Sequence, residues 1–308
     1  MVAAMDSDVT RIARMLADHA IVLLALGLAL VGLALAGTIT VVRFVARYRN
    51  LLVSMWAWAF RLARRLPVLG FALNRAQALA PTSYVALHLL LGLVAVASAM
   101  AFAVIAEEMV TGHVVATFDR AFATALHDRT SPAWHDVFSV VTRFGSNDAL
   151  IAGSAVVAAG LLLRRDYVLT AGWAVAQAGG GVLNTTLKNA FERARPESAD
   201  ALLAASSWSF PSGHAMGTFV FCGFGAYLLL RLARSWTITV VVIAVALAWC
   251  LVMAFTRLYL GVHFASDVVA GLIAAIAWVA VCISGIEIAL RGIGGSDRGQ
   301  LVIKILSS

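Results

Sequence analysis

Charged side chains are scarce in this sequence, and their scarcity excludes a protein that folds in water. Asp, Glu, Lys and Arg make up 13% of the 308 residues and hydrophobic residues 62%, and the mean hydropathy is +0.91. A globular protein needs more polar surface than this composition supplies. The sequence therefore indicates an all-α integral membrane protein.

Cysteine is rare as well, and what there is does not form a disulfide framework or a metal site. The three cysteines follow the spacing of neither, and each falls inside an apolar stretch: Cys222, Cys250 and Cys282. They are expected to be small apolar residues of the helix interior.

Long apolar runs are what the sequence has instead. A run of about 18 residues suffices to cross a bilayer as a helix. Seven spans are predicted, the third of them short: residues 20–42, 84–106, 149–163, 167–187, 213–230, 236–256 and 264–290. The expected architecture is one N-terminal transmembrane helix with a basic cytoplasmic segment in residues 1–83, a six-span core in residues 84–290, and a cytoplasmic tail in residues 291–308.

The distribution of arginine predicts the orientation of these spans. Segment 43–83 carries seven arginines and no acid, so it is expected on the cytoplasmic side. The loop 107–148 carries six acids and is expected outside, which places the N-terminus outside and the C-terminus inside. The alternative is a cleaved signal peptide within residues 1–36. Cleavage would put the arginine-rich segment outside, which the charge rule disfavours.

Two segments outside the spans are expected at the membrane surface. Residues 51–65 are basic and aromatic, and they either lie flat on anionic headgroups or form an ordinary connector. The loop 107–148 has amphipathic sequence, which is expected to form short interfacial helices around His127 and His135.

Positive charge reappears on the outer side, just after the fourth span. Lys188 and Arg195 are seven residues apart, so they are predicted to project from one helical face, with Pro196 ending the helix. Arg193 falls off that face and is expected to be a solvated or headgroup-facing charge. Glu192 is expected to pair with Lys188, four residues before it. A cluster of cations on this side indicates an anionic ligand.

Two further polar clusters lie at the mouths of later spans. Ser212, Gly213 and His214 follow Pro211 at the start of the fifth span. A helix N-terminus offers free backbone N–H groups to an anion. Gly213 lets the backbone approach such a ligand, and His214 can present a proton to it.

The third cluster comprises Arg257, His263 and Asp267, between the sixth and seventh spans. His263 and Asp267 are four residues apart and are predicted to share one helical face. Because an ionisable pair inside a membrane is expensive, it indicates function. Arg257 converges on this pair if the chain turns around Gly261.

Together, the three clusters offer the groups needed for displacement at phosphorus. Cations stabilise the charge on a transferring phosphoryl group. An imidazole oriented by a carboxylate is a competent nucleophile, and a second imidazole can protonate the leaving oxygen. A metal site at His263 and Asp267 is the alternative, which the three nearby cations disfavour.

The same residues resemble the signature of the type 2 phosphatidic acid phosphatase superfamily, which shares its site plan with vanadium haloperoxidases. The similarity lies in three ordered motifs: Lys188 with Arg195 and Pro196 after six residues; Pro211, Ser212, Gly213 and His214; and Arg257 with His263 after five residues and Asp267 after three more. Thr256 stands where the family usually has Ser. The resemblance covers the six-span core and implies its fold.

The resemblance also implies a role for each motif residue. His263 would attack phosphorus to form a phosphohistidine, Asp267 would orient it, and His214 would be the general acid. The phosphate would be bound by Lys188, Arg195, Ser212, Gly213 and Arg257. No metal and no other cofactor is implied.

The expected function is therefore that of a lipid phosphatase in a bacterial inner membrane, with its active site facing outside. Its substrate would be undecaprenyl pyrophosphate, phosphatidylglycerol phosphate or phosphatidic acid, and no nucleic-acid partner is expected. One alternative is a phosphotransferase of the same superfamily that passes the phosphate to a lipid or glycan hydroxyl. The other is a non-catalytic binder or transporter of lipid phosphates.

Overall fold

The computed structural model describes residues 2–63, 82–197, 207–232 and 236–293, and every element of regular secondary structure within these ranges is a helix. The first helices are α1 (Val2–Asp18), α2 (Ala20–Ala63), α4 (Thr82–Thr111), α5 (Val114–His127) and α6 (Pro132–Val141). A 3-10 turn, η1 (Thr142–Gly145), leads into α7 (Asn147–Leu163) and α8 (Tyr167–Phe191). The last three are α10 (Gly213–Leu232), α11 (Trp236–Tyr259) and α12 (Ala265–Ile293).

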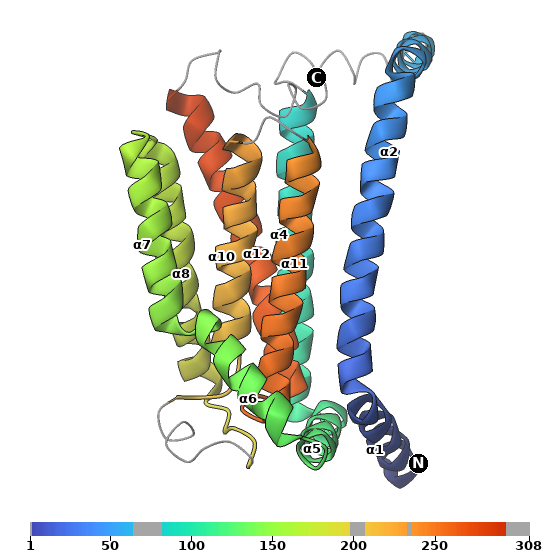
Figure 1. Ribbon diagram of the computed structural model, residues 1–308, viewed down its shortest axis with the longest axis vertical. Helices are drawn as coiled ribbons and strands as arrows, with labels where there is room; N and C mark the ends of the chain where they lie inside the picture. Colours follow the sequence, from blue (N-terminus) through green and yellow to red (C-terminus); the bar gives the residue numbers. More distant parts are fainter. Residues whose placement is uncertain (1, 64–81, 198–206, 233–235, 294–308) are drawn as a thin grey trace.

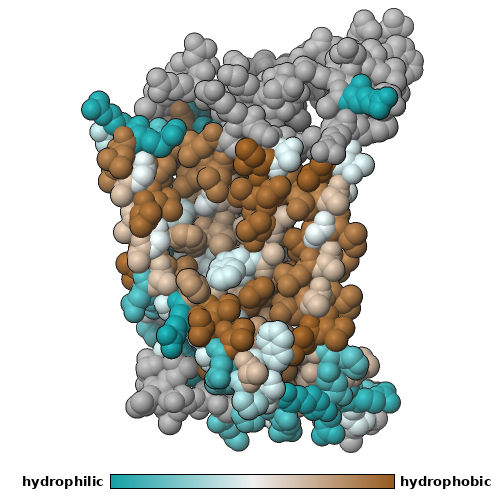
Figure 2. Space-filling model, in the orientation of Figure 1, coloured by the Kyte–Doolittle hydropathy of each residue, from teal (hydrophilic) through white to brown (hydrophobic). Residues whose placement is uncertain are grey.

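Six helices, α4, α7, α8, α10, α11 and α12, stand side by side as a bundle, and α2 is an extra helix beside it (Figure 1). Among the described residues, five helices are long and apolar enough to cross a membrane, or six if the bent pair of Pro132–Gly145 and Asn147–Leu163 forms one span. The predicted all-α membrane bundle is confirmed. Figure 2 shows the corresponding apolar belt between two hydrophilic ends.

The helix α8 is not among those candidate spans, although the sequence predicts one there. It carries Gln177, Asn184 and Lys188 along its length, which makes it more polar than its neighbours. It nevertheless runs beside α7 and α10 in the bundle (Figure 1). Gln177 and Asn184 are part-buried and line a groove between α7, α8 and α10, whereas Lys188 lies in the last turn of α8.

Close packing fixes α8 against α12. A Cβ added at Gly179 would lie 2.3 Å from Cζ2 of Trp278, so only glycine allows this approach. The indole N–H of Trp278 donates to the carbonyl oxygen of Ala176 at 2.9 Å, which satisfies its polar atom within the interface. Because these helices touch closely, their ends that carry Lys188 and Asp267 are held at the same end of the bundle.

The short helix α5 lies beneath that end of the bundle, and α1 lies beside it at the foot of α2 (Figure 1). The helix at residues 2–18 is absent from the sequence prediction, whereas the predicted helices around His127 and His135 are observed as α5 and α6. The two surface helices share a buried apolar cluster with α6 and α11, which includes Ala17, Leu126 and Tyr259. An ion pair of 2.5 Å between Arg129 and Asp18 also joins them.

Basic residues gather at the opposite end of the bundle. Arg164 and Arg165 lie in the turn after α7, and Arg231 lies in the last turn of α10. Arg231 is half-buried and pairs with Glu287 of α12. The three cysteines are free and lie in α10, α11 and α12, as expected. The rest of the predicted basic segment, residues 64–81, and the tail from residue 294 lie outside the described residues.

Candidate active site

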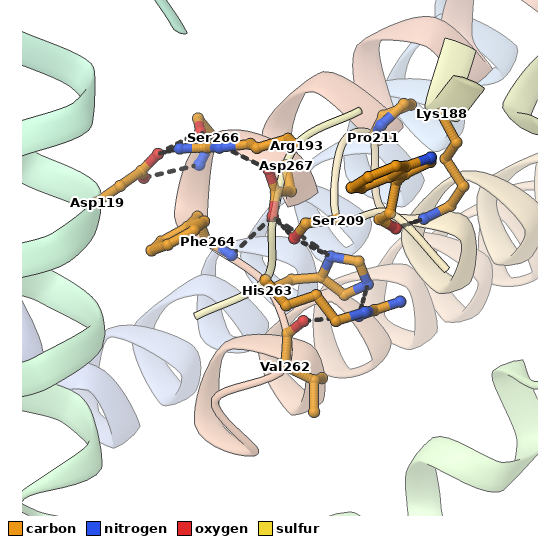
Figure 3. Close-up of polar contacts among 12 residues, drawn as sticks. Asp119, Lys188, Arg193, Ser209, Pro211, Val262, His263, Phe264, Ser266 and Asp267 are labelled. Carbon is orange, nitrogen blue, oxygen red and sulfur yellow. Dashed lines mark hydrogen bonds and ion pairs between the residues drawn. The ribbon is translucent and has the colours of Figure 1, made fainter. Parts of the chain in front are cut away.

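The three predicted clusters meet at the end of the bundle that α5 covers. They come from the C-terminal end of α8, the segment leading into α10, and the junction between α11 and α12 (Figure 3). Two backbone hydrogen bonds join these segments: Ser209 N–H to Arg193 O at 2.8 Å, and Ser212 N–H to Asp267 O at 2.9 Å. The residues from the three motifs therefore form one polar cluster.

His263 and Asp267 are in contact, but they do not share a helical face as the sequence predicts. The helix α12 begins at Ala265, so His263 precedes it and only Asp267 lies in its first turn. Asp267 accepts the backbone N–H of Phe264 at 2.9 Å, in the manner of the acidic residue of a capping box. Its Oδ2 also lies 3.4 Å from Nδ1 of His263. The pair is thus held by the start of the helix.

The chain turns at Gly261, just before this helix, as the sequence analysis expects. Gly261 has a φ of 66°, a conformation that residues with a side chain rarely adopt. The turn reverses the chain after α11 and brings His263 back over the end of that helix. The predicted turn around Gly261 is confirmed.

Hydrogen bonds define which nitrogen of His263 carries the lone pair. Nη1 of Arg195 lies 3.3 Å from Nε2 of His263, and a guanidinium can only donate. Nε2 is therefore the acceptor, and Nδ1 carries the proton that faces Asp267. Burial lowers the pKa of His263 to about 4, although Asp267 acts to raise it. The ring is consequently neutral at pH 7 and presents an unprotonated Nε2.

The predicted phosphate-binding cations surround this ring. Arg195 donates to the carbonyl oxygens of Val262 at 2.8 Å and Ser207 at 3.0 Å. Burial of Arg195 lowers its pKa. Arg257 is buried and donates to Oγ1 of Thr142 at 2.7 Å, and its Nε has no partner among the described residues. Unused donors in such a place suit an anionic ligand.

Two expectations about the first cation cluster are wrong. The helix α8 ends at Phe191, because Glu192 adopts a left-handed conformation with a φ of 46°. Arg195 therefore lies on the following loop and reaches the site without sharing a helical face with Lys188. Glu192 is exposed, and Lys188 instead donates to the carbonyl oxygen of Trp208.

The start of α10 forms the remaining wall of the cluster. Ser212 is fully buried, and its Oγ has no partner in the part of the chain that the structure describes. A Cβ on Gly213 would lie 3.0 Å from Oδ1 of Asn184 and 3.9 Å from Cε of Lys188, so a larger residue would crowd the space beside Lys188. His214 lies in the first turn of α10, within electrostatic reach of His263 and the cations.

Thr256 uses its hydroxyl within α11. The side chain is fully buried and donates to the carbonyl oxygen of Met253 at 2.7 Å. Its Oγ1 also lies 3.2 Å from Oγ1 of Thr142, which accepts a hydrogen bond from Arg257. Serine has the same hydroxyl, so the departure from the usual residue preserves this contact.

The sequence analysis gives four residues of this cluster no role in the site. Arg193, expected to be a solvated or headgroup-facing charge, is only 13% exposed and pairs with both Asp119 of α5 and Asp267. Ser209 donates to Oδ2 of Asp267, and Ser266 donates to Asp119. Ser209 and Ser266 lie close to motif residues in the sequence, so their position could have indicated that they belong to the site. Asp119 has no such signal, because it is one of six acids in a loop.

A groove leads from this cluster along the bundle. It has a volume of about 570 Å³ and lies between α7, α8 and α10. Its lining is mostly apolar and runs from Trp173 and Ile151 to Asn184 and Gly213. Ile151 is 67% exposed, so the groove opens sideways within the apolar belt. Because Gly213 lies beside Lys188, one end of the groove reaches the cations.

The fold and this cluster define an all-helical membrane protein with a cationic site suited to phosphate. Residues 167–289 match the model of the PAP2 superfamily. "Phosphatidylglycerophosphatase B" of Bacillus subtilis (strain 168) is 29% identical over 163 residues, which are 52% of this chain and 78% of that protein. A solved structure, described as the first transmembrane PAP2 type phosphatidylglycerolphosphate phosphatase from Bacillus subtilis, has a TM-score of 0.56 and 25% identity. The match covers 66% of this chain and 98% of that one.

The similarity to the PAP2 superfamily model thus lies in residues 167–289 of this chain. That segment holds every residue that the sequence motifs single out: Lys188, Arg195, Ser212, Gly213, His214, Arg257, His263 and Asp267. Asp119 lies outside it, on α5.

Proposed function

We propose that this protein is a lipid phosphatase that works through a phosphohistidine on His263. The observation that carries the proposal is the state of the His263 ring. Its Nδ1 faces Asp267 at 3.4 Å, and its Nε2 faces the guanidinium of Arg195 at 3.3 Å. A neutral imidazole with a carboxylate behind it and a phosphate-binding cation in front of it is arranged for attack on phosphorus.

The reaction has two steps. In the first, Nε2 of His263 forms a bond to phosphorus while the bond from phosphorus to the lipid oxygen breaks, and His214 protonates that oxygen. In the second, a water molecule that gives its proton to His214 attacks the phosphohistidine, which releases phosphate and restores His263. Lys188, Arg195 and Arg257 stabilise the phosphoryl oxygens throughout, so the proposal needs no metal ion.

The groove supports a lipid as the substrate. Its apolar lining opens sideways at Ile151 and ends beside the cations at Gly213. An acyl or isoprenoid chain in the groove would keep its contact with the membrane while its phosphate lies at His263. Both relatives are named as phosphatases of phosphatidylglycerol phosphate, so that lipid is the first substrate we propose. Phosphatidic acid and undecaprenyl pyrophosphate are the other two.

Phosphate release from these three lipids in detergent tests the function, with the water-soluble ester p-nitrophenyl phosphate alongside. We expect release from at least one lipid, with phosphatidylglycerol phosphate fastest, and we expect it to persist in EDTA. Release from none of the lipids by folded protein would refute a lipid phosphatase. Transfer of phosphate to an added alcohol or glycan in place of water would favour the phosphotransferase.

A variant that fills the groove tests the path of the lipid chain in the same assay. A Cβ on Gly181, which lines the groove, meets no atom within 4 Å, so Gly181→Phe is expected to fold. We expect it to raise KM for the lipids by about tenfold, which is about 1.4 kcal/mol of lost apolar contact. Hydrolysis of p-nitrophenyl phosphate should not change. Gly160→Phe on α7, also in open space and outside the groove, is the matched control.

We further propose that the site faces the outside of the cell. The basic residues at the far end of the bundle, such as Arg165 and Arg231, support this orientation because the cytoplasmic side collects them. An impermeant maleimide applied to intact cells should label Glu197→Cys, which lies at the site end, and should not label Arg165→Cys. The unsubstituted protein is the control for its three native cysteines. The reverse labelling pattern would invert the orientation.

A further inference from the structure

Arg193 forms a bridge between two buried carboxylates. Its Nη1 donates to Oδ1 of Asp267 at 2.5 Å and to Oγ of Ser266 at 2.7 Å, and its Nη2 donates to Oδ2 of Asp119 at 2.8 Å. The guanidinium also lies over the ring of Phe264, 4.4 Å from its centroid. The side chain of Arg193 is 13% exposed, and the two carboxylates are 1% and 0% exposed. An arginine that is this buried and that donates hydrogen bonds to two carboxylates is not a solvated charge.

Asp119 is held in place independently of Arg193. Its Oδ1 accepts the backbone N–H of Ser266 at 3.1 Å, and its Oδ2 accepts the hydroxyl of the same residue. Ser266 lies in the first turn of α12, where backbone N–H groups have no partner within the helix and where a negative charge is stabilised. Asp119 on α5 thus caps the helix that carries Asp267.

The bridge divides the two oxygens of Asp267 between two tasks. Oδ1 pairs with Arg193, while Oδ2 faces His263 and accepts the hydroxyl of Ser209. Figure 3 shows Asp267 between Arg193 and His263. Arg193 therefore approaches the carboxylate from the side away from the ring, whereas Arg195, two residues later, contacts Nε2 of His263. The two arginines contact opposite sides of the His263–Asp267 pair.

We propose that Arg193 and Asp119 are positioning residues for the nucleophile, and that α5 thereby contributes to the site from outside the matched family segment. Arg193 fixes the carboxylate of Asp267 so that Oδ2 points at Nδ1 of His263. Asp119 fixes Arg193 and balances its charge, which leaves the negative charge of Asp267 available to the imidazole. This role rests on the proposed function, because it acts through His263 as the nucleophile.

Charge balance explains why Arg193 needs a second carboxylate, besides Asp267, if a net negative charge is to remain beside His263. A guanidinium paired with Asp267 alone would neutralise it, and a neutralised carboxylate supports a developing imidazolium-like charge on His263 less well. With Asp119 present, the trio of two acids and one arginine keeps one net negative charge beside the ring. The other charged groups that act on the ring of His263 are the guanidinium groups of Arg195 and Arg257. Both groups are positive, so the remaining negative charge has to come from the trio.

The test separates turnover from substrate binding in the full-length protein, with the lipid it hydrolyses fastest. We expect Arg193→Gln to lower kcat by about 10- to 100-fold, as for other residues that orient a catalytic group. KM and the inhibition constant of inorganic phosphate should stay within about threefold, because Arg193 does not reach the phosphate. Arg193→Lys should recover much of kcat, and Asp119→Asn should lower kcat without raising KM. By contrast, Arg195→Gln should raise both KM and the inhibition constant.

The ion pair of Arg129 with Asp18 supplies matched controls, since it joins α5 to α1 at the surface and Arg129 is 47% exposed. Arg129→Gln and Asp18→Asn should leave kcat and KM unchanged. Two results overturn the inference: an Arg193→Gln protein with wild-type kcat, or one whose KM and inhibition constant rise as much as those of Arg195→Gln. If thermal unfolding shows that Arg193→Gln does not fold, the same criteria apply to Asp119→Asn. A wild-type protein that hydrolyses no lipid phosphate would refute the proposed function itself.

Discussion

Replacement of His263 by alanine should abolish phosphate release from every lipid substrate, with a loss of at least about 10⁴-fold in kcat. The ring is buried, neutral and oriented by Asp267, and its Nε2 lies 3.3 Å from Nη1 of Arg195. Phosphate binding should survive, because the cations remain. The measurement is steady-state phosphate release together with binding of inorganic phosphate.

A chemical trap makes the same prediction more specific. Wild-type protein quenched during turnover of a ³²P-labelled lipid should retain acid-labile, base-stable label, as a phosphohistidine does. His263→Ala should retain none. His135→Ala, in α6 and half exposed, is the matched control and should be labelled like the wild type. Label that persists in His263→Ala would mean that another residue is the nucleophile.

Replacement of His214 by glutamine should have the second largest effect, and its size should depend on the leaving group. For lipid phosphomonoesters we expect kcat to fall by about 10²- to 10⁴-fold, the usual contribution of a general acid. The lipid leaves as a strongly basic alkoxide unless it is protonated, whereas p-nitrophenolate is a weak base. The first turnover of p-nitrophenyl phosphate should therefore remain close to the wild-type rate.

The later turnovers of His214→Gln then report on the second step. Because the same imidazole accepts the proton of the attacking water, its loss should make the phosphohistidine accumulate. A rapid-mixing experiment should show a burst of about one p-nitrophenol per protein, followed by slow release. An equal loss on both kinds of substrate in the first turnover would argue against His214 as the acid. Asp148→Asn, in the first turn of α7, serves as a surface control.

Much of the fold follows from composition and local pattern. With charged residues at 13% and long apolar runs, the chain has to place its helices in lipid, and each run becomes a helix because the backbone must satisfy its own hydrogen bonds there. The turn at Gly261 is likewise local, because the conformation it adopts is one that glycine allows. The three motifs are also local, because each is defined by residue spacing. All three lie within the segment that the PAP2 superfamily model matches.

Helix ends were less predictable than helices. The sequence analysis extends a helix through Arg195 and places His263 on one, yet α8 stops at Phe191 and α12 starts at Ala265. Both boundaries depend on tertiary contacts: Lys188 donates to the carbonyl of Trp208 beyond the α8 end, and Asp119 caps α12 from another helix. Local propensity contains no information about partners that arrive from elsewhere in the chain.

The sequence by itself determined that the chain is a helical membrane protein and which residues the proposed phosphate chemistry would use, because hydropathy and motif spacing are local properties. Only the tertiary structure decided which other side chains contact those residues and hold them in place. The helical face of Arg193 predicts a solvated or headgroup-facing charge, whereas the side chain lies between Asp119 and Asp267, each 74 positions away in the sequence. A buried ion pair forms only where packing removes water from both partners, and that packing is set by how α5, α8 and α12 meet.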